Sequence, residues 1–174
     1  MPNTLTYNVI PTVWGDLWVF WEPAGVVWVD LLKEDPRGVK VFERLGRHFG
    51  YSVQMIPFPR VHEWSDHLLQ KLTDPALKIS VPFVSTGTKM QQDVWRKIST
   101  IPQGTVLTYQ ALAQAIERPH AHRVVANACG ANPVPLIVPC HRVVAKSGLG
   151  GFGFGVELKK WLLTGEGYCC DTDH

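Results

Sequence analysis

The sequence predicts an α+β protein, with a small N-terminal antiparallel sheet and helices followed by a mainly helical C-terminal part that contains a helix-turn-helix. Three observations support this prediction. Short runs rich in β-branched and aromatic residues open the chain, turn-forming residues separate them, and two helical patterns joined by a short break follow in the second half. With 174 residues, 45% of them hydrophobic and 18% charged, the chain can bury a sizeable core.

The first half opens with three expected strands, LTYNVI, DLWVFW and GVVWVDLL, separated by the turn-forming stretches PTVWG and EPAG. A helix is expected in RGVKVFERLGRHFG, where Phe42, Leu45 and Phe49 share one stripe. YSVQMIP predicts a further strand, and SDHLLQKLTD predicts a short helix capped by Ser65. This half is therefore expected to be α+β.

We place a domain boundary in SVPFVSTGT, because Pro, Gly, Ser and Thr gather there. The predicted division is an N-terminal α+β domain over residues 1–84 and a C-terminal domain over residues 85–174. The second domain opens with TKMQQDVWRKIST, which has Met90, Val94, Trp95 and Ile98 on one helical face.

Two short helical patterns then predict the helix-turn-helix. In TYQALAQAIE, helical spacing follows the expected cap Thr108; the set is Tyr109, Leu112, Ala113 and Ile116. In PHAHRVVANACG, Pro119 suits a first turn, and the apolar set is Ala121, Val124, Val125 and Ala128. Many pairs of helices share this pattern, so it does not by itself establish DNA binding.

The other face of the second helix favours contact with another molecule. It presents His122, Arg123, Ala126, Asn127 and Gly130. Small residues let a backbone come close to a partner, whereas a solvated face would carry more Lys and Glu. A surface helix with small residues by chance is the alternative.

Cysteine usage and charge bear on compartment and partners. The four cysteines are Cys129, Cys140, Cys169 and Cys170; they lie in the last third and two are adjacent, a poor framework for disulfides. We expect an intracellular protein, in the cytoplasm or nucleus depending on the organism. No membrane association is expected, because no stretch approaches the ~20 apolar residues that cross a bilayer. The net charge of +2 permits a nucleic-acid partner without requiring one, although residues 85–174 carry nine Lys and Arg against six Asp and Glu.

Cys140 lies in VPCHRVV, and three interpretations of its thiol are open. A metal site needs further ligands, and no C-x-x-C accompanies Cys140 and His141, so we expect no metal. The apolar flanks favour a buried small hydrophobe, since free cysteine is among the most buried residue types. A nucleophile needs a base or cation nearby, which an imidazole can provide.

Three stretches in unbroken order carry a resemblance: IPQGTVLTYQALAQAI, RPHAHRVVANACGANPVPLIVPCHRVV and SGLGGFGFGVELKKWLLTGEG. Between Val94 and Gly167 the chain resembles the C-terminal domain of the O6-alkylguanine-DNA alkyltransferases, single-use DNA-repair proteins. The P-C-H-R core with the upstream G-x-N-P is highly specific to that family. The first half resembles the family only in size and layout.

The resemblance implies irreversible transfer of an alkyl group from guanine O6 in duplex DNA to Cys140, once per molecule and without a cofactor. It assigns His141 to take the thiol proton through a water molecule and Glu166 to orient that imidazole. It makes Tyr109 the hydrogen-bond donor to the departing guanine and Asn132 the brace of the active-site turn. The residues alone would make Glu166 a solvated turn residue, Tyr109 a core aromatic and Asn132 a turn former.

The resemblance also implies that the damaged nucleotide is flipped out of the duplex and that the second helix lies in the minor groove. Arg123 would fill the space left by the base, with a plain surface arginine as the alternative. The expected DNA contacts are Thr108, Tyr109, Ala121, His122, Arg123, Ala126, Asn127 and Gly130. The expected pocket walls are Pro135, Val143, Gly151, Phe152 and Gly153. The implied partner is double-stranded DNA containing O6-alkylguanine, bound by a monomer.

Departures from the family pattern put groove depth and pocket size in doubt. Ala126 stands where glycine is common and His122 where a small residue is common. Some relatives hold a structural zinc in the first half, but residues 1–84 contain no cysteine, so we expect none. Cys129, Cys169 and Cys170 are expected to be incidental.

Three rivals to alkyl transfer remain. An alkyltransferase-like protein flags damage without repair, but such relatives lack the acceptor cysteine. A cysteine hydrolase would use Cys140, His141 and Glu166 on a scissile carbonyl and turn over an ester. A transcriptional regulator would bind a specific DNA sequence through the helix-turn-helix.

Overall fold

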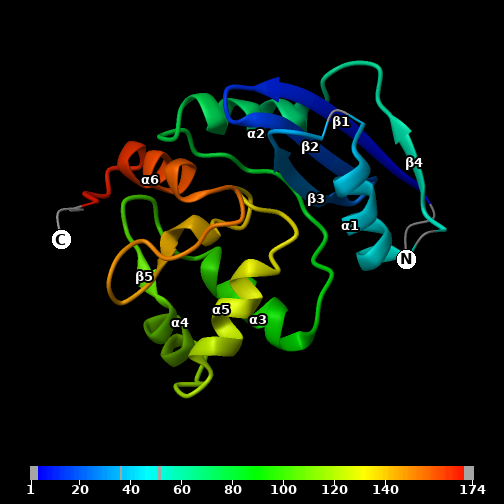
Figure 1. Cartoon of the computed structure of the whole chain (residues 1–174). Helices are drawn as coiled ribbons and strands as arrows, with labels where there is room; N and C mark the ends of the chain where they lie inside the picture. The colour runs from blue at the N-terminus through cyan, green and yellow to red at the C-terminus, as the bar shows by residue number, and fades with distance from the viewer. Residues whose placement is uncertain (1–3, 36, 51, 171–174) are drawn as a thin grey trace.

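The α+β prediction is confirmed by the computed structural model, which describes residues 4–35, 37–50 and 52–170 (Figure 1). In chain order its elements are β1 (Thr4–Thr12), β2 (Gly15–Glu22), β3 (Gly25–Leu32), α1 (Val39–Phe49), β4 (Gln54–Pro57), α2 (Glu63–Thr73), α3 (Lys89–Ile98), β5 (Leu107–Thr108), α4 (Tyr109–Ala115), α5 (His122–Gly130), the 3₁₀ turn η1 (Cys140–Arg142), β6 (Val143–Val144) and α6 (Val156–Gly165).

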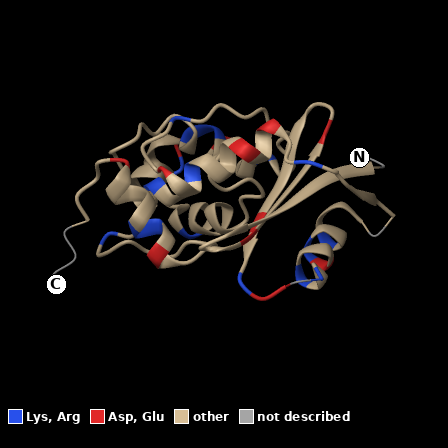
Figure 2. Cartoon of the chain, turned by 90° about the horizontal axis from the view of Figure 1, so that it is seen from above, with Lys and Arg blue, Asp and Glu red and all other residues tan. Residues whose placement is uncertain are grey.

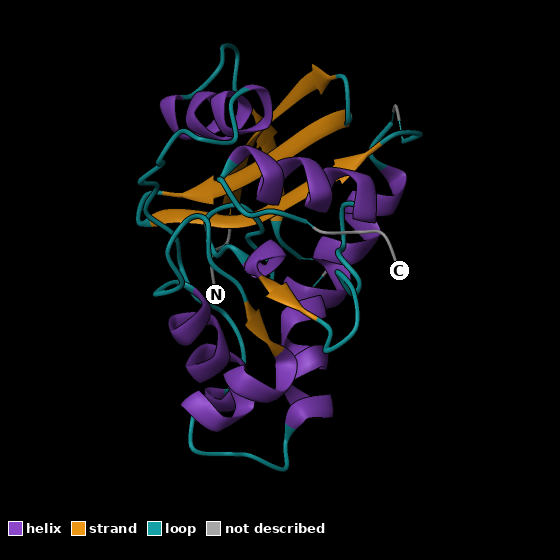
Figure 3. Ribbon diagram, turned by 90° about the vertical axis from the view of Figure 1, so that its left-hand side faces the viewer, coloured by secondary structure: helices purple, strands orange, loops and turns teal. Residues whose placement is uncertain are grey.

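The first half forms a four-stranded sheet in the order β3-β2-β1-β4. The pairs β1–β2 and β2–β3 are antiparallel, as the predicted N-terminal sheet requires, while β4 returns after α1 and pairs in parallel with β1. Figure 3 shows this sheet at one end of the molecule, with the short β5–β6 pair among the helices of the other end. The sheet is therefore mixed, with one parallel edge.

Both faces of the sheet are covered, which explains the nearly continuous apolar run of β2. Successive side chains of a strand point to opposite faces. Accordingly, Trp18 and Phe20 pack in the cluster that contains Val41 and Leu45 of α1. Val19, between them, joins the larger cluster that extends into the helices of the second half. The sheet thus lies between α1 and the rest of the core.

The predicted boundary near residue 84 stays a prediction. The segment that contains it pairs with the edge of the sheet, since the Val26 N–H donates to Pro82 O and Val84 N–H donates to Val26 O, both at 2.9 Å. One hydrophobic cluster also spans both halves. Any division into domains therefore crosses a shared core.

The predicted helix-turn-helix is formed by α4 and α5, which pack against each other and against α3. The side chain of Thr108 caps α4, as expected, by accepting a hydrogen bond from the Ala111 N–H at 3.0 Å. Leu112 and Ala113 face the core. The anchor for α5 includes a hydrogen bond from Trp95 Nε1 to Ala128 O at 2.8 Å.

Three local expectations were wrong. The second helix begins at His122, so Pro119 lies before it, because Arg118 N–H returns to Ala113 O and closes a turn first. Val124 is 51% exposed and does not join the apolar face. The helix expected to be capped by Ser65 is capped three residues earlier, where the His62 ring accepts from the Trp64 N–H, and Ser65 lies buried within the helix.

Charged residues lie mostly on helices and loops, and the strands are largely free of them (Figure 2). Within the described ranges no helix is both long and apolar enough to span a membrane.

We predict that Leu112→Ala destabilises the helix-turn-helix. Leu112 is 0% exposed on α4, so truncation removes buried methyl groups and leaves a cavity; the expected cost is about 2–5 kcal/mol of unfolding free energy. Urea unfolding measures it. Gln110→Ala, at an exposed position of the same helix, serves as the control. Equal stability of both variants would show that α4 is not packed as described.

Candidate active site

Cys140 begins η1, at a point where two cavities meet. A cavity of about 200 Å³ is lined by Tyr109, Ala126, Cys129, Gly130, Cys140, Gly151, Phe152 and Gly153. A second cavity, of about 300 Å³, shares Cys129, Gly130, Cys140 and Gly153 with the first and extends to Trp28, Asp30, Arg44, Pro135 and Phe154. Cys140 itself is 8% exposed. The sulfur is buried, yet it borders space that a ligand could enter.

Asn132 holds the turn that carries the cysteine. Its Nδ2 donates to Val138 O at 2.9 Å and lies 3.2 Å from Cys140 Sγ, while its Oδ1 accepts from the Val134 N–H at 3.0 Å. These backbone contacts fit the bracing role expected for Asn132. The contact with the sulfur was not expected. Burial raises the pKa of the Cys140 thiol, while the Asn132 hydrogen bond and the charge of Lys159 act in the opposite direction.

His141 is fully buried, and its Nε2 lies 3.0 Å from Oε1 of Glu166. A carboxylate only accepts, so Nε2 carries the proton and Nδ1 is left as the acceptor of a neutral ring. Nδ1 has no hydrogen-bond partner among the described residues. Burial lowers the pKa of His141, an effect that Glu166 opposes and that the cations of Arg142 and Lys71 reinforce.

Two cations complete the surroundings of Glu166. Arg142 donates from Nε to Oε2 and from Nη2 to Oε1, both at 2.9 Å, and from Nη1 to Ile101 O at 2.7 Å. Lys71 Nζ, from α2, lies 2.9 Å from Oε1. Burial alone would raise the pKa of Glu166, but hydrogen bonds from Arg142, His141 and Lys71 outweigh it and hold the pKa well below its usual range.

A third buried cation lies on the cysteine side. Lys159 is 0% exposed and donates from Nζ to Val143 O at 2.6 Å and to Gly151 O at 3.0 Å. Burial lowers its pKa to about 8, against the influence of Cys140 and Cys129. The two carbonyls tie α6 to β6 and to the glycine-rich loop SGLGGFGFG over residues 147–155.

The other expected site residues lie as follows. Tyr109 begins α4 and is half-buried at the smaller cavity, where burial raises the pKa of its hydroxyl. His122, Arg123, Asn127 and Gly130 are exposed on α5, whereas Ala121 and Ala126 are half-buried. Pro135 lines the larger cavity rather than the smaller one. Among the described residues, no group of three or more His, Cys, Asp or Glu is placed to hold a metal ion.

Two of the expected positions stand out. The side chain of Val143 is fully buried in the core, and the residue is not among those that line the two cavities around Cys140, so its role as a pocket wall stays a prediction. Cys129 was expected to be incidental, but it lines both cavities. Burial raises the pKa of its thiol to about 12, so it is a weak nucleophile near neutral pH.

Comparison with known proteins identifies the family. The sequence model of a protein family, the 6-O-methylguanine DNA methyltransferase DNA-binding domain, matches residues 89–168. An inducible methylated-DNA–protein-cysteine methyltransferase of Bacillus subtilis is 35% identical over 125 residues, which span 71% of this chain and 70% of that protein. The chain belongs to the O6-methylguanine-DNA methyltransferase family.

The structural comparison extends this likeness to nearly the whole chain. A crystal structure of Mycobacterium tuberculosis OGT in complex with DNA aligns with a TM-score of 0.75 and 30% identity, covering 93% of this chain and 92% of that one. A probable methyltransferase of Acanthamoeba polyphaga mimivirus is 56% identical over 77 residues, 44% of this chain. The chain matches about half the length of several curated relatives, including those from the mimivirus and Shigella flexneri.

Three residues of this methyltransferase-family site were missed by the sequence reasoning: Lys71, Arg142 and Lys159. Arg142 follows the Cys-His pair directly, so its position was a signal. Lys71 and Lys159 lie in helical patterns where lysine usually marks a solvated position, and nothing local distinguishes them.

We predict that Glu166 makes stability depend on pH. Its pKa in the folded state lies below the unfolded value of about 4.3. The ionised carboxylate therefore stabilises the fold above a pH of about 4.3. This stabilisation is lost as the pH falls below that value toward the pKa of the folded state. Urea unfolding from pH 7 to pH 3 should show this loss. Glu166→Gln should cost about 3–5 kcal/mol at pH 7 and reduce the slope below pH 5.

Glu157→Gln, at an exposed position of α6, is the control and should retain the slope of the unmodified protein. If Glu166→Gln kept that slope as well, the carboxylate would not be held in the ionised form described above.

Proposed function

We propose that this protein repairs DNA by direct reversal of damage, transferring an alkyl group from O6 of guanine in duplex DNA to Cys140, once per molecule. One observation carries the proposal. The buried Cys140 borders a cavity between α4–α5 and the glycine-rich loop, and the next residue, His141, is hydrogen-bonded to Glu166. The family membership supports it, and the Bacillus subtilis relative is named for this chemistry.

In the proposed reaction, Cys140 Sγ attacks the alkyl carbon as the carbon–O6 bond breaks. The thiol proton passes through a water molecule to Nδ1 of His141, the ring nitrogen that has no hydrogen-bond partner in the part of the chain that the structure describes. The electron pair of the broken bond stays on guanine, which leaves as an anion. Tyr109, at the cavity wall, donates a hydrogen bond that stabilises this anion. The product is a thioether with no hydrolysable bond, so the cysteine is not regenerated.

Ionisation of the thiol is costly because Cys140 is buried, and two groups offset that cost. Asn132 Nδ2 is within hydrogen-bond distance of the sulfur, and Lys159 supplies a nearby positive charge held by two carbonyls. Because its pKa is lowered, His141 is neutral near pH 7 and is ready to accept a proton. Its Nε2–Glu166 contact stabilises the imidazolium that forms.

Access to the alkyl carbon requires the nucleotide to leave the duplex. We propose that α5 lies in the minor groove, with the small residues Ala126 and Gly130 at the mouth of the cavity and Arg123 in the space left by the base. Such binding is tolerant of sequence, as a damage scanner requires. All the groups involved come from one chain, which supports action as a monomer.

Mass spectrometry of the protein after incubation with a duplex containing O6-methylguanine tests the transfer. One methyl group per molecule is expected on the Cys140 peptide, because the thioether is stable. No transfer is expected with Cys140→Ala, whereas Cys129→Ala should retain it. Repeated turnover, hydrolysis of an ester substrate, or methylation at another residue would contradict the proposal.

Comparison of two substrates tests the role of Arg123. Arg123→Ala should slow repair in duplex DNA by about tenfold or more, since extrusion of a base costs a few kcal/mol. Reaction with a free O6-alkylguanine base should be unchanged, because no base has to be flipped. Arg96→Ala, an exposed arginine on α3, should leave both rates unchanged. Equal losses on both substrates would exclude the flipping role.

A further inference from the structure

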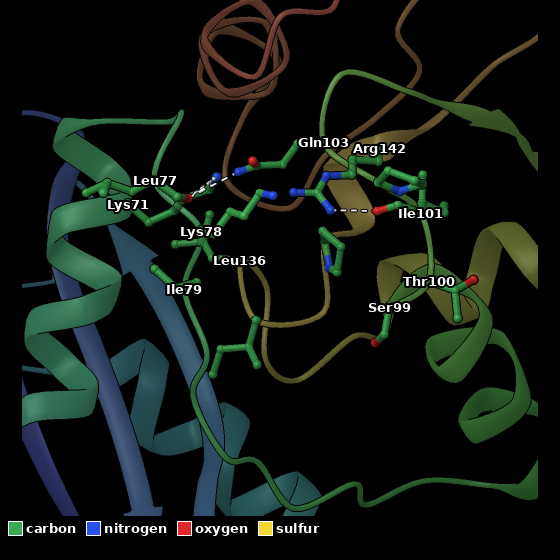
Figure 4. Close-up of a pocket in the computed structure, with 13 residues that line it drawn as sticks. Lys71, Leu77, Lys78, Ile79, Ser99, Thr100, Ile101, Gln103, Leu136 and Arg142 are labelled. Atoms are coloured by element: carbon green, nitrogen blue, oxygen red, sulfur yellow. Dashed lines mark hydrogen bonds between the residues drawn. The ribbon is translucent and has the colours of Figure 1, made fainter.

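A separate cavity is lined by Pro139 and Arg142, the residues on either side of Cys140 and His141. It has a volume of about 350 Å³ and is walled by both halves of the chain (Figure 4). Lys71 and Lys78 come from the first half, and Gln103, Pro139 and Arg142 from the second. Gln103 Nε2 also donates to Leu77 O at 3.1 Å, across the two halves. No residue of α4 or α5 lines this cavity, so it is distinct from the proposed DNA-binding face.

The charges at the inner wall do not balance. The side chains of Lys71 and Arg142 are 2% and 11% exposed, and both are paired with the single carboxylate of Glu166. Burial lowers the pKa of Lys71, an effect that Glu166 opposes. Its Nζ contacts Pro75 O, Leu77 O and Glu166, which can only accept, and three donated bonds require the ammonium form. One buried positive charge therefore has no partner of its own. Such a charge is costly unless an anion lies near it.

Arg142 lines the cavity and has N–H donors left over. A guanidinium has five N–H groups, and Arg142 uses three of them on Glu166 and Ile101, which leaves two. In Figure 4, the ammonium of Lys78 and the guanidinium of Arg142 point toward one another. Lys78 is exposed and makes no ion pair within the described chain. Two cations facing each other suit an oxyanion between them.

The surrounding charges favour an anion as well. None of the residues that line the cavity is acidic. Besides Glu166, Asp74 is the carboxylate that influences Lys71; it is exposed and accepts from the Ala76 N–H. The remaining walls are mixed: Leu77, Ile79, Ile101, Leu136 and Ile137 form an apolar side, and Ser99 and Thr100 add hydroxyl groups. A cavity of this size lies within the range of small-molecule sites.

We propose that this cavity binds a small phosphomonoester, with the phosphate between Lys78 and Arg142 and the organic group against the apolar wall. A phosphomonoester carries a charge of about −1.5 to −2 near neutral pH, which matches the unpaired buried cation together with Lys78. A phosphodiester of DNA carries a single charge and is the less favoured occupant. This site does not depend on the proposed alkyl transfer.

Titration of the intact protein with adenosine 5′-monophosphate by calorimetry tests the site. Saturable binding is expected, with displacement by inorganic phosphate and no binding of adenosine. Lys78→Gln should weaken binding about tenfold, since it removes one charge-assisted contact. Lys33→Gln makes the same charge change at an exposed position outside the cavity and should bind normally. Amide NMR shifts should cluster at residues 77–79 and 99–103.

Three outcomes would overturn the proposal. The first is the absence of saturable binding up to about 10 mM, a range already weaker than typical specific affinities. The second is equal affinity of Lys78→Gln and the unmodified protein for adenosine 5′-monophosphate. The third is stronger displacement by a single-stranded oligonucleotide without terminal phosphates than by inorganic phosphate. The last result would assign the cavity to DNA. Because Lys78 is exposed and outside the alkyl-transfer machinery, Lys78→Gln should keep the same rate of Cys140 alkylation without ligand. A failure of alkyl transfer would therefore leave the binding result interpretable.

Discussion

The carboxylate of Glu166 is the interaction on which the rest of the candidate site depends. One buried group holds His141, Arg142 and Lys71, which belong to two segments far from it and from each other in sequence. Arg142 continues the network to the carbonyl of Ile101. Without the carboxylate, two buried cations would lose their partner and His141 would lose its orientation. Glu166 and nearby carbonyl oxygens accept the hydrogen bonds of both cations, although one carboxylate balances the charge of only one of them.

The first half of the chain takes part in the site through this network and through the sheet. Lys71 reaches Glu166 from α2, and the Val29 N–H of β3 donates to Pro133 O at 2.8 Å, directly after Asn132. The edge of β3 therefore supports the turn that positions the cysteine. A boundary between two independent domains would cut across both contacts. The sheet and α2 are part of the framework of the site rather than an appendage to it.

Local sequence patterns predicted much of this fold, because the β-branched and aromatic run of β2 and the apolar stripes of α3 and α4 are each encoded within a few residues. The family motif predicted the His141–Glu166 pair, which periodicity alone would not have done. Lys71 was missed because a lysine in a helix normally faces water, and only a carboxylate 95 positions later makes its burial possible. Cys129 was dismissed for a similar reason: its place beside Cys140 depends on how α5 and η1 meet.

Burial of Cys140 has a consequence for a thiol that, as we propose, reacts only once. A raised pKa keeps it protonated at rest and slow toward stray electrophiles, which would otherwise consume the protein irreversibly. The groups that favour the thiolate, Asn132 and Lys159, are already in place and need no rearrangement. A bound guanine that excludes water would strengthen their electrostatic effect on the sulfur. Reactivity is then tied to occupancy of the cavity, which protects an acceptor that cannot be regenerated.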